Sequence, residues 1–115
     1  MTRREFSNLI TKHFQFIESK LPPQYYPIWD YLKRGEADQK AVFDAGKSDC
    51  DGVHKISKHQ LGKAADILIM KIVPGERDQV AEPMVEFPDL WRVIRARWEE
   101  YGGSHMIPWD QCHFE

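Results

Sequence analysis

KAADILIMKIV, residues 63–73, contains the longest uninterrupted apolar run of the chain, residues 67–70. A short apolar run of this kind, rich in β-branched residues, predicts a largely buried strand over 63–73. Asp66 stands at the start of the run. A lone buried carboxylate costs several kcal/mol unless it is paired or bound to a metal. The stretch therefore predicts a buried strand and, at Asp66, a candidate cation site.

Helices and loops surround this strand. Thr2 and Glu5 fit a capping box, and apolar residues then recur at helical spacing, which predicts a helix over 3–20 that ends before Pro22-Pro23. A second amphipathic helix is predicted over 89–101, with these side chains inward: Leu90, Val93, Ile94, Trp98 and Tyr101. The other segments predict an extended edge strand at 25–32, a short helix at 36–45, loops at 47–62 and 74–88, and a strand-turn-strand at 105–115. This order predicts an α+β fold, a small antiparallel sheet with helices packed on one side.

Length and composition narrow the functional classes. A chain of 115 residues suits a single domain over 1–115. The net charge of −2 lacks the basic excess of nucleic-acid-binding proteins, so no nucleic-acid partner is expected. An apolar run of four residues is far below a membrane span, and residues 1–6 carry no secretion signal. These features predict a protein that is cytoplasmic at synthesis and does not insert into a membrane.

The five histidines separate into two groups. His13 lies on the apolar stripe of the first helix and is interpreted as a packed histidine, and His54 and His105 lie in predicted loops and are expected to be solvated. His59 and His113 differ because carboxylates accompany them. His59 and Asp66 would lie about 10 Å apart along a helix and about 23 Å apart in an extended chain. Only a turn brings them together, and Gly62 supplies the backbone freedom for one.

A second cluster lies at Asp110-Gln111-Cys112-His113. In a turn, residues three apart face the same way, so Asp110 and His113 can address one ion. We predict a shell of His59, Asp66 and His113 with a fourth position open, as in catalytic zinc sites, and Asp110 as the general base. Spacing alone fits ordinary loop histidines and capping aspartates better than it fits metal ligands. Cys112 is interpreted as a small buried hydrophobe, with a fourth thiolate ligand as the alternative.

The two clusters together resemble a known signature pair. Ser57-x-His59-x-x-Gly62-x-Ala64-x-Asp66, followed by Asp110-x-x-His113-Phe114-Glu115, is similar to the zinc D-Ala-D-Ala carboxypeptidase and L-alanyl-D-glutamate endopeptidase family. That family includes phage endolysins and shares its fold with the Hedgehog signalling domain. The resemblance implies a Hedgehog/DD-peptidase-like fold, Zn²⁺ held by His59, Asp66 and His113, and Asp110 as the base.

The resemblance extends to residues upstream of these clusters and implies roles for two further residues. Arg34-Gly35-Glu36-Ala37-Asp38-Gln39 and Ala45-Gly46-Lys47-Ser48 are similar to the family's Arg-x-x-x-x-Gln and Gly-x-Ser segments. The match implies that Arg34 stabilises the oxyanion and that Ser57 forms a hydrogen bond with the substrate or with a zinc ligand. The stretch before Arg34 departs from the pattern in being rich in proline and aromatic residues. An aspartate at position 110, where some relatives have glutamate, favours the endolysin-like members.

The implied activity is that of a monomeric zinc peptidase acting on peptidoglycan stem peptides, between L-Ala and D-Glu. A phage enzyme of this kind would reach the cell wall after a separate protein permeabilises the membrane. Three alternatives stay open: a D-Ala-D-Ala carboxypeptidase, a non-catalytic domain that binds zinc or a cell-wall peptide, and a metal-dependent nuclease. The sequence of the predicted 74–88 loop does not identify a substrate.

Overall fold

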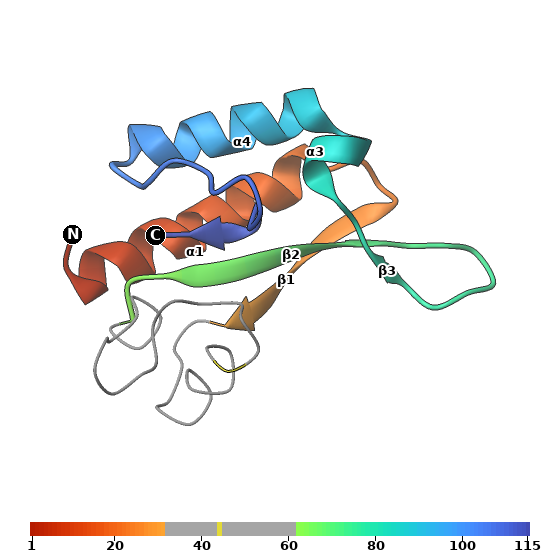
Figure 1. Ribbon diagram of the computed structural model, residues 1–115, viewed down its shortest axis with the longest axis horizontal. Helices are drawn as coiled ribbons and strands as arrows, with labels where there is room; N and C mark the ends of the chain where they lie inside the picture. The colour runs from red at the N-terminus through yellow and green to blue at the C-terminus, as the bar shows by residue number, and fades with distance from the viewer. Residues whose placement is uncertain (32–43, 45–61) are drawn as a thin grey trace.

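Three helices and four strands are arranged around a central strand in the computed structural model, which describes residues 1–31, 44 and 62–115 (Figure 1). The predicted helix at 36–45, apart from Asp44, and the predicted loop up to residue 61 lie outside the described residues, as does His54. None of the helices in the described part of the chain is both long and apolar enough to cross a membrane.

The first helix, α1 (Arg3–Lys20), confirms the predicted bounds. The Thr2 hydroxyl oxygen accepts a hydrogen bond from the Glu5 backbone N–H at 3.1 Å, which satisfies one of the donors left open at a helix start. The helix ends at Leu21, before Pro22, because proline lacks the N–H that would continue the helix. Its buried stripe consists of Phe6, Ile10, His13 and Ile17.

The sheet is built on β2 (Ala65–Lys71), the strand predicted over 63–73. On one side residues 66–71 of β2 pair with β1 (Tyr25–Tyr31), in antiparallel register from Tyr25 opposite Lys71 to Trp29 opposite Ile67, and the register shifts before Tyr31 meets Asp66. On its other side it pairs with two short antiparallel strands, β4 (His113–Phe114) at its start and β3 (Gln79–Val80) at its end. The predicted edge strand is confirmed, since an edge position tolerates a proline, Pro27.

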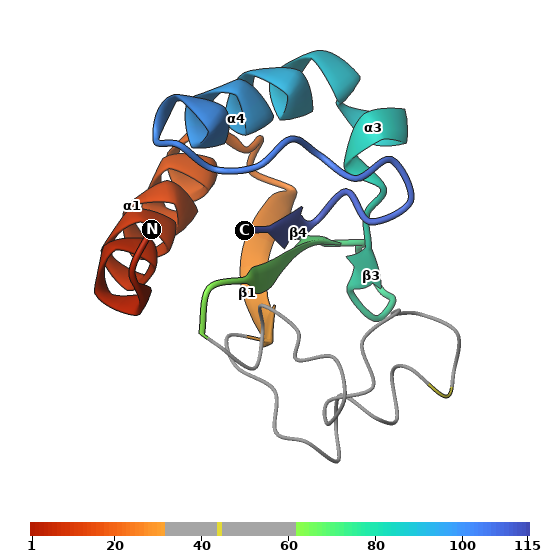
Figure 2. The ribbon, with the colours of Figure 1, turned by 60° about the vertical axis from the view of Figure 1, so that its left-hand side comes forward.

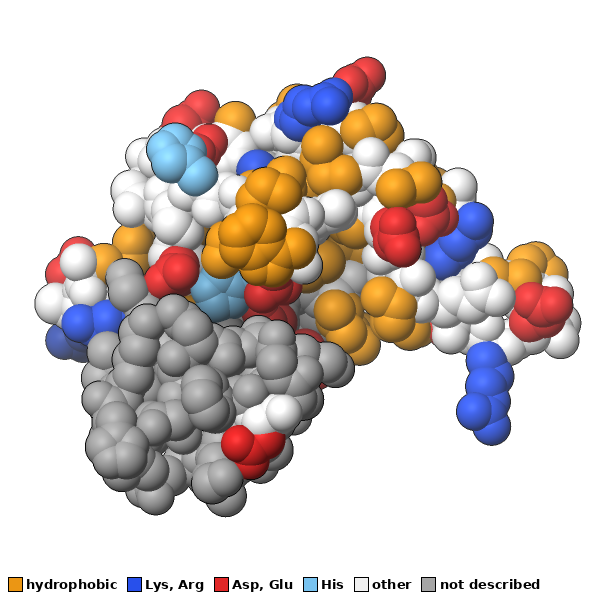
Figure 3. Space-filling view, viewed as in Figure 1, with side chains coloured by type: hydrophobic (Ala, Val, Ile, Leu, Met, Phe, Trp, Pro, Cys, Tyr) orange, Lys and Arg blue, Asp and Glu red, His pale blue; other side chains and the backbone are white. Residues whose placement is uncertain are grey.

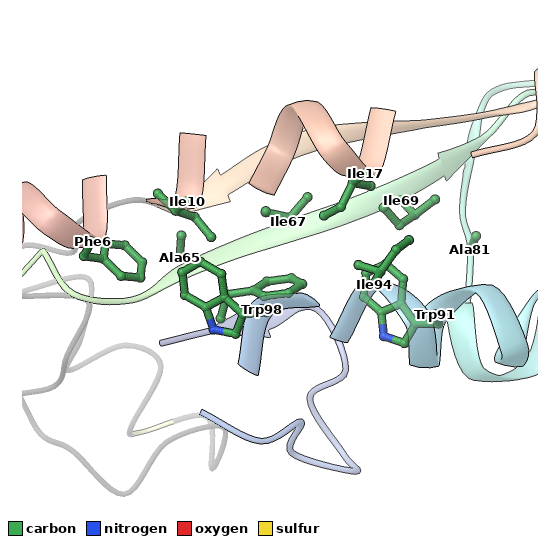
Figure 4. Close-up of a cluster of buried hydrophobic side chains, with 11 residues drawn as sticks. Phe6, Ile10, Ile17, Ala65, Ile67, Ile69, Ala81, Trp91, Ile94 and Trp98 are labelled. Carbon is green, nitrogen blue, oxygen red and sulfur yellow. The ribbon is translucent and has the colours of Figure 1, made fainter. Parts of the chain in front are cut away.

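One face of the sheet carries the core. Alternate residues of β2 point to the same face, and Ala65, Ile67 and Ile69 are fully buried there. They pack against α1 and against α4 (Pro88–Glu100), which Figures 2 and 4 show lying over the sheet. The predicted α+β class, with a small antiparallel sheet and helices, is therefore confirmed.

Two predictions about the second half of the chain need correction. The predicted loop at 74–88 contains β3 and a short helix, α3 (Pro83–Glu86), because the Ala81 N–H donates to the Ile69 carbonyl at 2.8 Å and Pro83 fits the first turn of a helix. Val93, predicted inward, is 55% exposed, whereas Trp91 is fully buried. At 100° per residue the two side chains point to opposite sides of α4.

His13 is buried in an aromatic cage, which confirms its interpretation as a packed histidine. The side chain is fully buried, and neither ring nitrogen has a hydrogen-bond partner among the described residues. Burial, followed by the charges of Arg95 and Arg97, lowers the pKa of His13 to about 4. The imidazole is therefore neutral at pH 7. The rings around it belong to Phe16, Trp98, Tyr101 and Phe114.

Replacing His13 with leucine is expected to stabilise the protein and to reduce the loss of its free energy of unfolding at acidic pH. At pH 7 the gain is about 1–3 kcal/mol, because the buried ring nitrogens without partners are removed. The contribution of His13 to the free energy of unfolding is constant above the imidazole's unfolded pKa of 6.5 and falls as the pH drops towards 4, because only the unfolded chain takes up a proton at this residue. Between pH 7 and pH 5 this effect of His13 amounts to about 2 kcal/mol.

Urea unfolding of both proteins at the two pH values measures this difference. The His13→Leu protein should lose about 2 kcal/mol less than the wild type on acidification. Equal losses in the two proteins would show that His13 does not control this response.

Candidate metal centre

The pairing of β2 with β4 brings together two residues that are 47 positions apart in the sequence. Asp66 lies directly opposite His113 in the antiparallel register, and the Ile67 N–H donates to the Cys112 carbonyl at 2.9 Å. The Nδ1 atom of His113 lies 3.1 Å from Oδ1 of Asp66. Asp66 and His113 are only 8% and 9% exposed, so the contact is largely shielded from water.

A turn adds a second carboxylate to this pair. The Asp110 N–H donates to the Ile107 carbonyl at 2.9 Å, and the His113 N–H donates to the Asp110 carbonyl at 3.2 Å. These two hydrogen bonds close successive turns, so the side chains of Asp110 and His113 lie on the same side of the segment. Ligand atoms of Asp66, Asp110 and His113 all lie within 4.8 Å of one another. Asp110 is exposed, and Figure 3 shows acidic and histidine side chains side by side on this face.

The helix α4 fixes the segment that carries His113. Three of its side chains, four and three positions apart on one face, donate to alternate backbone oxygens of residues 111–115. The pairs are Trp91 Nε1 with Gln111 at 3.3 Å, Arg95 Nη1 with His113 at 2.7 Å, and Trp98 Nε1 with Glu115 at 3.1 Å. Sequence reasoning missed Arg95. The sequence feature that could have identified it is an arginine within the otherwise apolar stripe of a predicted helix.

Arg95 combines three contacts in a buried position. It is 4% exposed, its Nη2 donates to the Ser104 carbonyl at 3.3 Å, and its guanidinium lies 4.2 Å from the centre of the Phe114 ring. Burial lowers the pKa of Arg95 to about 10, so the side chain stays charged at neutral pH. A fixed cation therefore holds the backbone of β4 from the core side.

The electrostatics of the site favour positive charge at His113. Burial by itself lowers the pKa of His113, but hydrogen bonds to the carboxylates of Asp66 and Glu115, together with the charges of Asp66 and Asp110, raise it to about 9. An imidazole nitrogen and two carboxylates also form a donor set that suits divalent cations, without being specific for zinc. The described residues therefore fit a bound metal ion.

The structure brings together some of the predicted site residues and does not describe others. Asp66, Asp110 and His113 converge, although they come from two separate clusters of the sequence. His59, Ser57 and Arg34 lie outside the described residues. Just before Asp66, Gly62 has a φ of +70°, in the left-handed region that favours glycine, and it lies in a turn, as its predicted role requires. Ala64 and Ala65 after it are fully buried.

Cys112 packs against the core beside the site. Burial, followed by the charge of Asp110, raises the pKa of its thiol to about 12, so the thiolate needed for metal binding is disfavoured. The cysteine is also absent from the group of metal-ligating atoms found among residues 62–115. The structure therefore favours the small hydrophobe over the thiolate ligand.

Substituting Cys112 with alanine should leave metal binding intact. We expect the variant to bind the same number of zinc ions as the wild type, with an affinity within about threefold, because no zinc–sulfur bond is lost. Elemental analysis after dialysis, with a competing chelator for the affinity, measures both quantities. A tenfold or larger loss of affinity would identify the thiolate as a ligand.

A scan against models of protein families, a search of curated proteins and a search of solved structures each found no match to this chain.

Proposed function

We propose that this chain is a zinc-dependent peptidase that hydrolyses peptidoglycan stem peptides at the bond between L-Ala and D-Glu. One observation carries the proposal: ligand atoms of Asp66, Asp110 and His113, predicted from two separate sequence clusters, lie within 4.8 Å of one another. The order and spacing of the clusters, which resemble the zinc carboxypeptidase and endopeptidase family, support the choice of substrate. A Hedgehog/DD-peptidase-like fold is part of the proposal.

The proposed ligands are His59, Asp66 and His113. Asp66 and His113 are nearly buried at the β2–β4 pair, a position in which the sheet fixes their separation. When bound, zinc would act as a Lewis acid that lowers the pKa of a coordinated water to about 7. Two imidazoles and one carboxylate leave a fourth position open, the arrangement of catalytic rather than structural zinc sites.

The remaining proposed residues would handle protons and charge. Asp110 is exposed and lies close to Asp66 and His113, so its carboxylate can take a proton from water and return it to the leaving amine. Arg34, a permanent cation, would stabilise the oxyanion that develops on the peptide carbonyl. Ser57 would form a hydrogen bond with the substrate.

Digestion of purified murein tests the proposal. Zinc-loaded protein is incubated with sacculi, and the released fragments are identified by mass spectrometry, with the His113→Ala protein as the control. We expect peptides that begin at D-Glu and glycan that retains L-Ala. Release of terminal D-Ala alone would instead identify a carboxypeptidase, and zinc binding without any product would identify a binding domain.

A further inference from the structure

The imidazole of His113 is held from both of its ring nitrogens. Nδ1 faces Oδ1 of Asp66 at 3.1 Å, and Nε2 faces Oε1 of Glu115 at 3.3 Å. The two nitrogens of an imidazole point in diverging directions, so the two carboxylates contact opposite edges of the ring. Among the described residues, Glu115 is not part of the group of ligand atoms that Asp66, Asp110 and His113 form.

We propose that Glu115 is a positioning residue for the metal centre: its carboxylate accepts the Nε2–H of His113 and so leaves Nδ1 as the nitrogen that binds the ion. The inference rests on the proposed zinc site. A metal-bound nitrogen carries no proton, and the neutral ring keeps its one proton on the other nitrogen. An acceptor fixed at Nε2 therefore selects both the tautomer and the orientation of the ring.

The local backbone suits Glu115 to this role. In an extended segment, residues two apart point to the same face, so Glu115 follows His113 while Phe114 between them is fully buried in the core. The backbone oxygen of Glu115 accepts hydrogen bonds from Trp98 Nε1 at 3.1 Å and from the Ser104 N–H at 2.7 Å. The carboxylate thus extends from an anchored backbone.

The burial of the contact makes it energetically relevant. The Glu115 side chain is 22% exposed and that of His113 is 11% exposed, so the hydrogen bond is partly shielded from water. Charge-assisted hydrogen bonds in such surroundings are stronger than those between exposed side chains. Carboxylate partners of metal-bound histidines typically raise metal affinity about 10- to 100-fold.

Zinc affinities of three variants test the inference, measured by competition with a chromophoric chelator. Glu115→Ala should bind zinc about 10- to 100-fold more weakly than the wild type. Glu115→Gln, whose amide oxygen can accept the same N–H, should stay within about threefold of the wild type. Glu18→Ala removes an equal charge at an exposed position of α1 and should not change the affinity.

Nitrogen-15 NMR of the zinc-loaded proteins adds a readout that a loss of stability does not mimic. The wild type and Glu115→Gln should show His113 with its proton on Nε2 and the metal on Nδ1. Wild-type affinity in Glu115→Ala, or equal losses in the alanine and glutamine variants, would overturn the inference. Neither result depends on murein cleavage, so an inactive protein with these zinc affinities would refute the peptidase and leave the role of Glu115 intact.

Discussion

The Asp110→Ala protein is expected to bind one zinc ion per chain and to hydrolyse murein about 100- to 10,000-fold more slowly than the wild type, the usual contribution of a general base. The physical reason is that Asp110 is exposed at the edge of the site, where it can exchange protons with water, while Asp66 and His113 are nearly buried. Zinc content by elemental analysis and release of stem-peptide fragments measure the two effects separately.

His113→Ala is the matched comparison for this experiment. It removes a proposed ligand and should lose both zinc and hydrolysis. Retained turnover in Asp110→Ala would show that another group is the base. Loss of zinc from Asp110→Ala would show that Asp110 is a ligand, an arrangement that its distance from the other two residues also allows.

Replacing Trp98 with alanine should have the largest effect on stability. The indole is fully buried, contacts the rings of Phe6 and Phe114 at 5.8 Å between centroids, and donates its N–H to the backbone oxygen of Glu115. Its removal leaves a cavity between α1, α4 and β4 and is expected to cost about 3–5 kcal/mol of the free energy of unfolding. The melting temperature should fall by about 15 °C.

Val93→Ala is the control on the same helix, because Val93 is 55% exposed and should change stability by less than about 0.5 kcal/mol. Urea unfolding of both variants gives the comparison. A loss below about 1 kcal/mol in Trp98→Ala would show that the core relaxes around the missing indole.

The elements that the sequence predicts best are those determined by local periodicity. The helix over 3–20 and the strand over 63–73 carry their apolar patterns within their own residues. The strand β3 does not, since two exposed residues form it only by pairing with the end of β2. Val93 was misplaced because aliphatic character indicates the inner face of a helix only when the phase of the stripe is known.

The candidate site likewise combines residues that the sequence identifies with contacts that only the folded chain creates. Asp66 and His113 are singled out by residue type, but only the antiparallel register of β2 and β4 places them opposite each other. Arg95 and Glu115 act through single hydrogen bonds to His113, one to its backbone and one to its ring. No spacing rule predicts the contact of Arg95, because it depends on how α4 packs over the sheet. The two-residue spacing of His113 and Glu115 places their side chains on one face but does not by itself predict the hydrogen bond between them. The ligand role of His59 stays a prediction.

Anomalous diffraction from crystals of the zinc-loaded protein, recorded at the zinc absorption edge, tests the metal centre most directly. We predict one anomalous peak per chain about 2.0–2.2 Å from Nδ1 of His113 and from a carboxylate oxygen of Asp66. An ion bound elsewhere on the chain, or no peak beside these two residues at saturating zinc, would contradict the proposed centre.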